Sequence, residues 1–420
     1  MLHYGIIGCG MMGQEHLRNI ALLDDATVAA IFEPDPGMRA AASALVPDAR
    51  MVGSVAEVLA MPEVNCLLIA SPNHLHLGQL EEIARIRPLP VMCEKPLFTD
   101  PADAPRLAAL RAAYPAPIWV AMEYRYMPPV AHLIREAQAA TGGIKMLTIR
   151  EHRFPFLSKV GDWNRFNSNS GGTLVEKCCH FFDLMRLIAG CNPIRVMASG
   201  GQAVNHLNEV YDGKQSDIWD NAYVIVDFEN GMRAMLELCM FAEGSRYQEE
   251  ISAVGPKGKI ECLVPGPGRF WPSHLGPAPV PKVIVSPRNP AGPVELEIRV
   301  DPSLLAAGDH NGSTFFQHKG FQRAVNGTQT PDVSLNDGWW AVAMGLAAQE
   351  SARTGKAISL LNADITPHLL SPRRQAAKEN RTIQPSLPAN LLSHQTVSNH
   401  SICRRLPLYI HAVRPNVYGR

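Results

Sequence analysis

The sequence predicts an α/β fold in two parts: an N-terminal parallel sheet wound with helices, then an α+β part with a large, mostly antiparallel open sheet. Three observations predict it. A glycine-rich turn joins the first apolar strand to the first helix, near residues 8–13. Buried strands and helices then alternate to about residue 122, which is the rhythm of parallel βαβ units. Between 194 and 262, strand patterns are separated by turn residues, which is typical of antiparallel sheets.

The first element is the strand HYGIIG, which leads directly into Gly8, Gly10 and Gly13 in G-x-G-x-x-G spacing. The first glycine permits a tight turn, the second lets the backbone approach a pyrophosphate, and the third lets helix and strand pack closely. A helix beginning near Met11 and Met12 would hold the phosphate on its N-terminal amides. Strand, turn and helix together predict a Rossmann dinucleotide-binding domain.

The second strand, TVAAIF, ends at Glu33, about 20 residues after the last glycine of the turn. A carboxylate at this point can accept hydrogen bonds from both ribose hydroxyls and repels a 2′-phosphate. No basic residue follows directly, since Arg39 already belongs to the next helix. The pattern therefore favours NAD over NADP as the cofactor, with a solvated loop carboxylate as the alternative interpretation of Glu33.

Three more strands are predicted, at 65–71, 90–96 and 117–125. Ligands of open parallel sheets bind at the carboxyl ends of the strands. Besides the glycine turn, the residues that this rule places at the cofactor are Ser71, Pro72, Asn73, His76, Glu94 and Lys95. A lysine held there can donate to a substrate hydroxyl or carbonyl and stabilise developing negative charge. We therefore expect Lys95 to be catalytic; the alternative is an ordinary surface lysine.

The segment GGTLVEKCCHFFD (171–183) predicts an apolar helix that places Glu176, His180 and Asp183 on one face. A buried carboxylate and imidazole must hydrogen-bond each other or a ligand. Taken alone, the pair would favour an internally satisfied polar contact. In a chain with a dinucleotide domain it becomes a candidate proton-handling site, in which Glu176 orients His180 as the acid/base.

Two later segments suggest a pocket. Trp163, Asn164 and Arg165 combine an aromatic face with amide and guanidinium donors, which suits a sugar ring; an ordinary surface loop is an equally good interpretation. Nine prolines within 263–293 predict an extended loop, either over the pocket or at an interface. A helix over 338–355 closes the fold.

Composition excludes several function classes. The chain has 39 basic and 39 acidic residues, so no overall charge favours nucleic acid or an anionic membrane. No apolar run reaches the roughly 18 residues that a membrane span needs, and the N-terminus has no secretory pattern. Nine cysteines, mostly in apolar contexts and without zinc-site spacing, indicate a reducing cytosol and no metal site. We expect a cytoplasmic protein.

The chain divides into a NAD-binding domain at 1–122, a substrate-binding and oligomerisation domain at 123–360, and a tail at 361–420. Residues 362–420 contain two acidic and eight basic residues and no sustained periodicity. This composition predicts a basic, disordered tail. It would also fit a frameshifted or extended reading frame.

Motifs along the chain occur in a specific order. They are the glycine turn, SPNHLHL (71–77), CEKPL (93–97), EYR (123–125), SGGTLVEKCCHFFDLM (170–185), DNAYVIVDFENGMRAMLEL (220–238) and GPKGKIEC (255–262). Over residues 3–360 this order resembles the Gfo/Idh/MocA oxidoreductases, a family that includes glucose–fructose oxidoreductase and myo-inositol 2-dehydrogenase.

The resemblance implies an NAD(P)-dependent dehydrogenase acting on CH–OH donors, with an inositol- or aldose-like substrate. Lys95 matches the substrate-contacting lysine of the family's E-K-P motif, and His180 matches the histidine assigned as acid/base. Glu176 stands where many relatives have an aspartate, which is a departure. Asp183 matches a position with a structural role.

The resemblance also implies that Arg125 and His310 contribute to the substrate pocket and that the chain forms a homodimer or homotetramer. Two alternatives exist on the same fold: a glycosidase that uses bound NAD transiently, and a dinucleotide-dependent sugar sensor without catalysis. The presence of Lys95, His180 and Glu176 disfavours the sensor. It does not separate a dehydrogenase from a glycosidase.

Overall fold

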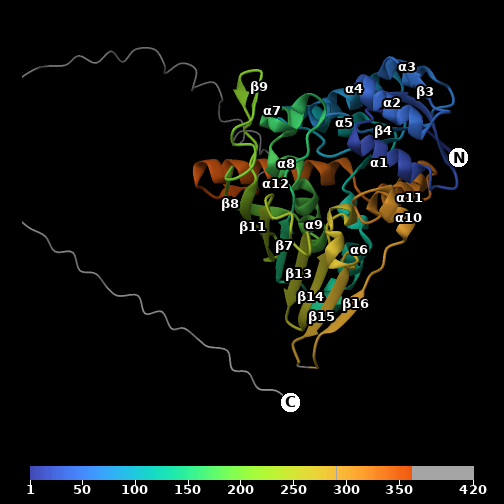
Figure 1. Ribbon diagram of the computed structural model, residues 1–420. Coiled ribbons are helices and arrows are strands. Elements are labelled where there is room, and N and C mark those ends of the chain that lie inside the picture. Colours follow the sequence, from blue (N-terminus) through green and yellow to red (C-terminus); the bar gives the residue numbers. More distant parts are fainter. Residues whose placement is uncertain (290, 362–420) are drawn as a thin grey trace, which may run out of the picture. The chain divides into compact units, whose positions relative to one another are not determined.

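The computed structural model describes residues 1–289 and 291–361, and its N-terminal part is a six-stranded parallel sheet with the order β3-β2-β1-β4-β5-β6 (Figure 1). The strands are β1 (Leu2–Ile7), β2 (Ala26–Phe32), β3 (Arg50–Val52), β4 (Cys66–Ile69), β5 (Val91–Cys93) and β6 (Ile118–Val120). The intervening helices are α1 (Met11–Ile20), α2 (Pro36–Leu45), α3 (Val55–Ala60), α4 (His76–Ile86) and α5 (Ala104–Ala113). The order reverses between β1 and β4, where open α/β sheets bind ligands. The predicted Rossmann domain is confirmed.

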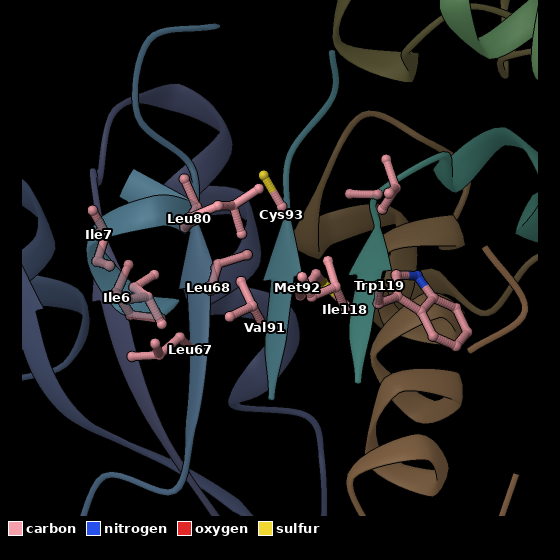
Figure 2. Close-up of a cluster of buried hydrophobic side chains, with 14 of the residues drawn as sticks. Ile6, Ile7, Leu67, Leu68, Leu80, Val91, Met92, Cys93, Ile118 and Trp119 are labelled. Carbon is pink, nitrogen blue, oxygen red and sulfur yellow. The ribbon is translucent and has the colours of Figure 1, made fainter. Parts of the chain in front are cut away.

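The core of this part consists of short apolar strands that are buried on both faces (Figure 2). The indole of Trp119 extends from β6 toward α11 (Ser313–Val325). It reaches Gly320 of that helix, where a Cβ atom would lie 2.4 Å from the ring. Only a glycine permits this approach, which joins the parallel sheet to the C-terminal part of the chain.

The second sheet has nine strands in the order β16-β15-β14-β13-β7-β12-β11-β8-β17. Their bounds are β7 (Met146–His152), β8 (Pro193–Gly201), β11 (Asn221–Phe228), β12 (Arg233–Cys239), β13 (Glu249–Gly255), β14 (Gly258–Val264), β15 (Lys282–Pro287), β16 (Val294–Glu297) and β17 (Ile358–Ser359). Neighbours pair antiparallel except β7 and β12, which are parallel. The expected mostly antiparallel sheet is confirmed. A separate small hairpin joins β9 (Val210–Tyr211) and β10 (Lys214–Gln215).

Four helices pack against this sheet and contribute to the second core: α6 (Pro128–Thr141), α8 (Thr173–Glu176), α9 (Cys179–Ala189) and α12 (Leu335–Thr354). The short helix α7 (Asn167–Ser170) precedes α8, while α10 (Pro302–Ala307) and α11 contact α1 of the parallel-sheet part. The long helix α12 lies between the two sheets (Figure 1). It begins at a capping box formed by Ser334 and Asp337. Near its start Gly338 approaches Leu97 and Val120.

Two expectations about secondary structure were wrong in part. Residues 282–287 of the proline-rich segment form β15, because they pair with β14. The strand expected over 117–125 ends at Val120, and the chain continues as the 3₁₀ helix η3 (Glu123–Tyr126). Within the described residues, no helix combines the length and apolarity that a membrane crossing requires. The expected disordered tail lies outside the described residues.

Candidate active site

The glycine-rich turn has the geometry that its three glycines predict. Gly8 has a φ of +84°, and a Cβ atom on it would lie 2.6 Å from the backbone of Ser71. A Cβ atom on Gly13 would lie 2.8 Å from the carbonyl oxygen of Gly8. Around Gly10, by contrast, no described atom lies within 4 Å of the Cβ position. This open space at the N-terminus of α1 fits the approach of a pyrophosphate.

Glu33 lies directly after β2, beside this turn. Its Oε2 accepts a hydrogen bond from the Cys9 amide at 2.5 Å, and its Oε1 accepts one from the Asp35 amide at 2.8 Å. Each carboxylate oxygen can accept a second hydrogen bond. The carboxylate is therefore fixed in place yet still able to bind hydroxyl groups.

A cleft of about 980 Å³ opens beside the start of α1. Its polar lining comes from α1, the end of β5, η3, the end of β7, the loop before η4, the α8–α9 segment, the start of β13 and the loop before α11. It consists mainly of Glu15, Lys95, Glu123, Tyr124, Arg153, Lys159, Glu176, Lys177, His180, Glu249 and His310. Met11 and Met12 border it, as do residues 265–269 and 278–281 of the proline-rich segment. These two stretches lie at the pocket, which is one of the two locations expected for the segment 263–293. Four predicted residues, Lys95, Glu176, His180 and His310, meet in this cleft.

Lys95 follows β5, and its Nζ donates a hydrogen bond to the carbonyl oxygen of Glu176 at 3.1 Å. Burial favours the neutral amine, but the Cys179 thiol and the carboxylates of Glu94 and Glu176 outweigh it and raise the pKa of Lys95. The side chain is therefore a cation at neutral pH. An ammonium has three N–H groups, so two are left for a substrate oxygen.

The segment 171–183 is not one continuous helix. Helix α8 ends at Glu176 and α9 begins at Cys179. Between them the Cys178 amide bonds to the Thr173 carbonyl at 3.3 Å, which is a wider turn than the α-helical one. The extra residue rotates His180 away from Glu176, so the expected Glu176–His180 hydrogen bond is wrong. Glu176 Oε1 instead pairs with Lys159 Nζ at 3.3 Å.

His180 is buried at the base of the cleft. Its ring lies parallel to that of Tyr124, with 4.2 Å between the centres and 9° between the planes. Its Nδ1 has no hydrogen-bond partner among the described residues, and the same is true of Glu176 Oε2. Burial and the nearby charges of Lys95 and Lys177 hold the pKa of His180 well below its usual value. The imidazole is therefore neutral at neutral pH and able to accept a proton.

Sequence reasoning missed a buried charged cluster around Lys177, whose charge had no predicted role. Lys177 Nζ lies 2.8 Å from Glu151 Oε1 and also donates to the Tyr124 hydroxyl. Glu151 on β7 stands directly opposite Glu249 on β13. Burial, with Glu151 nearby, raises the pKa of Glu249 to about 7. The signal in the sequence was Glu151 itself, a carboxylate at an inward position of an alternating strand.

A second cluster links α1 to the loop before α11. His310 Nδ1 lies 2.8 Å from Glu15 Oε1, and its Nε2 lies 3.5 Å from Glu123 Oε1. Burial opposes the charged imidazole, but Glu123 and Glu15 outweigh it and raise the pKa of His310 to about 9. The ligand-type atoms of the three lie within 4.8 Å of one another. His310 is itself the counter-ion of both carboxylates.

Several predicted site residues make structural contacts outside the cleft. His76 is fully buried, with its ring nitrogens 2.7 Å from the Pro96 carbonyl and 2.9 Å from the Ser71 carbonyl. Arg125 is buried against Asp183, with both hydrogen bonds at 2.5 Å. Neither residue borders the cleft, so the structure does not bring them to the site, and their roles as cofactor and substrate ligands stay predictions. Asp183 is structural, as the resemblance implied.

The Trp163–Asn164–Arg165 stretch lies in the 3₁₀ helix η4 (Val160–Arg165) and does not line the cleft. Asn164 Nδ2 donates to the Leu157 carbonyl at 3.1 Å, and Arg165 pairs with Glu209 at 2.9 Å. Asn164 and Arg165 are buried, so the structure does not bring this stretch to the cleft, and its sugar-binding role stays a prediction. Lys159, whose Nζ lies 4.5 Å from the centre of the Trp163 ring, is the residue that this segment contributes to the cleft.

The remaining predicted cofactor residues lie at the strand ends. Glu94 points inward, where its Oε1 lies 2.9 Å from His16 Nε2. Ser71 and Pro72 are partly exposed at the turn after β4. Asn73 Nδ2 donates to the Ser170 carbonyl at 3.2 Å. Ser71, Pro72 and Asn73 stay predictions as cofactor contacts.

The chain matches models of an oxidoreductase family in two segments: the NAD-binding Rossmann fold over residues 2–122 and the C-terminal alpha/beta domain over residues 138–360. It is 26% identical over 272 residues to an inositol 2-dehydrogenase of Corynebacterium glutamicum strain R, covering 64% of this chain and 76% of that one. It is 24% identical over 362 residues to a myo-inositol 2-dehydrogenase of Thermotoga maritima, covering 86% and 98%. The solved structure of a levoglucosan dehydrogenase, in complex with NADH and levoglucosan, matches with a TM-score of 0.69 at 20% identity, over 86% of this chain and 100% of that chain, and so shares the fold.

Proposed function

The chain belongs to the Gfo/Idh/MocA oxidoreductase family, and from that premise we propose that it transfers hydride between NAD and a secondary alcohol of a cyclic polyol or sugar. The inositol 2-dehydrogenases among its relatives support an inositol- or aldose-like substrate. The glycine turn and Glu33 fit a dinucleotide without a 2′-phosphate, which supports NAD rather than NADP.

One observation carries the proposal: a neutral imidazole with an unpartnered nitrogen and a cationic lysine border the same cleft. His180 Nδ1 has no described partner, and Lys95 Nζ donates to a single carbonyl. A buried polar atom without a partner is costly, and a ligand in the cleft can satisfy it. A hydroxyl group needs both an acceptor for its proton and a donor for its oxygen.

The residues divide the work of alcohol oxidation. His180 takes the hydroxyl proton, since its imidazole is neutral at neutral pH. Lys95 donates an N–H to the same oxygen and stabilises the alkoxide character that develops there. Glu176 Oε2 is available to a second substrate hydroxyl. Bound NAD supplies the hydride acceptor.

The test is NADH formation by purified protein with NAD and a panel of inositols, aldoses and amino sugars. We expect absorbance change with one class of substrate. His180→Ala and Lys95→Ala should each lower turnover by about 10²- to 10⁴-fold while the NAD dissociation constant stays near the wild-type value. Wild-type turnover in either variant would overturn that residue's role. If NAD binds but no panel member is oxidised, the next test is release of nitrophenol from nitrophenyl glycosides. Release would identify a glycosidase, and the absence of release would favour a sensor.

The open face of the nine-stranded sheet supports self-association as a homodimer or homotetramer. Met146, Tyr223 and Ile225 are exposed on β7 and β11. Exposed apolar side chains on a sheet face are a common feature of protein–protein interfaces. Light scattering of the purified protein would test this, with Tyr223→Lys expected to lower the measured mass; a wild-type monomer would contradict it.

A further inference from the structure

Lys177 is a buried lysine, with a pKa lowered by burial, to which the proposed chemistry gives no direct contact with substrate. It stands in the break between α8 and α9, the same break that separates Glu176 from His180. Its Nζ lies 2.8 Å from Glu151 Oε1 and donates to the Tyr124 hydroxyl. Its side chain is therefore held at two points, one on β7 and one on η3.

Stability alone does not account for a lysine at this position. Burying an ion pair costs desolvation energy that the attraction between the charges often fails to recover, and apolar residues of similar size are frequently as stable. Glu151 also faces Glu249 across the β7–β13 pair, and Arg153 lies 3.6 Å from Glu151, so Lys177 belongs to a largely buried cluster of four ionisable groups. A methionine at 177 with a glutamine at 151 would avoid the buried charges.

The second contact of Lys177 leads to the candidate acid/base. The Tyr124 ring lies flat on the His180 ring at 4.2 Å and meets the edge of Phe181 at 5.6 Å and 74°. Two ring contacts fix the plane of the tyrosine, and its hydroxyl is anchored by Lys177. An anchored tyrosine limits the rotation of the His180 ring, whose Nδ1 has no described partner of its own.

We propose that Lys177 is a positioning residue: through the Tyr124 hydroxyl it holds the tyrosine ring against His180 and so fixes the orientation of the imidazole in the cleft. In this role Lys177 and Tyr124 take the place of the carboxylate partner that a catalytic histidine often has. The proposal rests on the proposed function of His180, but the ring geometry can be measured without substrate.

The carboxylates of Glu123 and Glu176 border the same cleft as His180. Four other charged groups lower the pKa of His180: Lys95 after β5, Lys177 in the α8–α9 break, Arg153 after β7 and His310 before α11. All four oppose protonation of the imidazole, so removal of the Lys177 charge favours the protonated form. Removal of the Tyr124 hydroxyl leaves that charge in place. The two changes therefore have different effects on pH dependence but the same effect on orientation.

The experiment compares Lys177→Met, Tyr124→Phe and the double variant, with Lys145→Met as a matched control at an exposed lysine. NMR of the His180 ring protons reports the ring current of Tyr124 without substrate. We expect this shift to diminish in Lys177→Met and Tyr124→Phe, and to persist in Lys177→Arg and Lys145→Met. With substrate, both single variants should lose about 10- to 100-fold in kcat with little change in KM.

The double variant should lose no more than the more impaired single variant, because both changes break one interaction. The acid limb of the kcat/KM profile should move to higher pH in Lys177→Met and stay in place in Tyr124→Phe. The proposal would be overturned if the kcat losses of the two single variants multiplied in the double variant. It would also be overturned if the ring-current shift of the His180 protons were unchanged in the single variants. If Lys177→Met does not fold, Lys177→Met/Glu151→Gln removes both charges together and is judged by the same measurements. Absence of turnover in the wild type would count against the proposed function. The ring-current measurement would still decide the positioning role of Lys177, because it needs no substrate.

Discussion

The carboxylate of Glu176 pairs with Lys159, 3.3 Å away, and not with His180. The pair joins the α8–α9 segment to the loop before η4, and it leaves Glu176 Oε2 without a described partner at the cleft. Glu176 is thus arranged to bind something in the cleft, whereas His180 depends on other residues for its orientation.

Glu176→Gln should therefore act on substrate binding. We expect kcat/KM to fall by about tenfold, mainly through KM, because a charge-assisted hydrogen bond becomes a neutral one. The acid limb of the pH profile should stay in place, since Glu176 makes no hydrogen bond to His180 and is not among the charged groups that mainly shift the pKa of His180. A shift of that limb to lower pH would show that Glu176 supports the imidazolium after all.

Two glycines of the turn, Gly8 and Gly10, should respond differently to alanine. Gly8→Ala places a Cβ against the Ser71 backbone at a φ of +84°, so we expect a loss of folding stability of at least about 1 kcal/mol. Gly10→Ala meets no described atom within 4 Å and should fold normally but bind NAD more weakly. Thermal unfolding and fluorescence titration with NAD distinguish the two. Equal NAD affinity in Gly10→Ala and the wild type would contradict the assigned phosphate site.

Asp183→Asn should destabilise the protein without directly impairing chemistry. The substitution removes the negative charge that Arg125 contacts with two hydrogen bonds, and it leaves the guanidinium buried. Breaking such a buried ion pair lowers the free energy of unfolding by about 3–5 kcal/mol. The matched control is Arg106→Met, which removes the half-exposed pair with Glu81 and should cost less than about 1 kcal/mol. Urea unfolding measures both. If folded Asp183→Asn bound substrate more weakly than the wild type, Arg125 would be supported as a substrate ligand.

His310 should make stability depend on pH in a defined window. Its pKa is raised from 6.5 to about 9, so the stability it contributes is complete below pH 6.5 and is lost as the pH rises to about 9. The full contribution is about 3 kcal/mol. Glu15, with its pKa lowered to about 2 by His310 and its hydrogen bonds against the effect of burial, stays ionised throughout this window. The unfolding free energies of the wild type and His310→Gln should converge between pH 6.5 and 9; parallel curves would contradict the ion-paired arrangement.

Glu33→Gln tests cofactor choice. The amide oxygen keeps one of the two hydrogen bonds from the Cys9 and Asp35 amides, the other is lost because an NH2 group cannot accept, and the charge that repels a 2′-phosphate is gone. We expect the ratio of NADP to NAD dissociation constants to fall by about tenfold or more. An unchanged ratio would mean that another group excludes the phosphate.

The parts of the fold that follow from local pattern could be predicted from the sequence. The glycine turn is one, because strand, turn and helix are contiguous and each glycine has a steric role of its own. The position of Lys95 is another, since the end of a buried parallel strand is itself a local feature. His310 entered the site only through family resemblance, and the structure places it in the cleft.

The departures of the structure from the predicted site share one cause, which is that long-range partners are invisible in a local pattern. Periodicity put Glu176 on the face of His180 because it assumes an unbroken helix, and the extra residue in the turn at Cys178 carries no signal in composition. Arg165 has the composition of a sugar ligand but pairs with Glu209, 44 positions away. The Lys177 cluster depends on the register of β7 against β13, which no single segment specifies.

The proline-rich wall of the cleft has a thermodynamic consequence. Pro265, Pro267, Pro279 and Pro281 border the space in which the substrate is expected to bind. Proline has little backbone freedom to lose, so a wall built from it is largely ordered before anything binds. A ligand that packs against such a wall forfeits less conformational entropy than one that must immobilise a flexible loop. The cleft can therefore hold a small polar molecule in one orientation, even though such a molecule makes few contacts, because binding does not also have to order the wall.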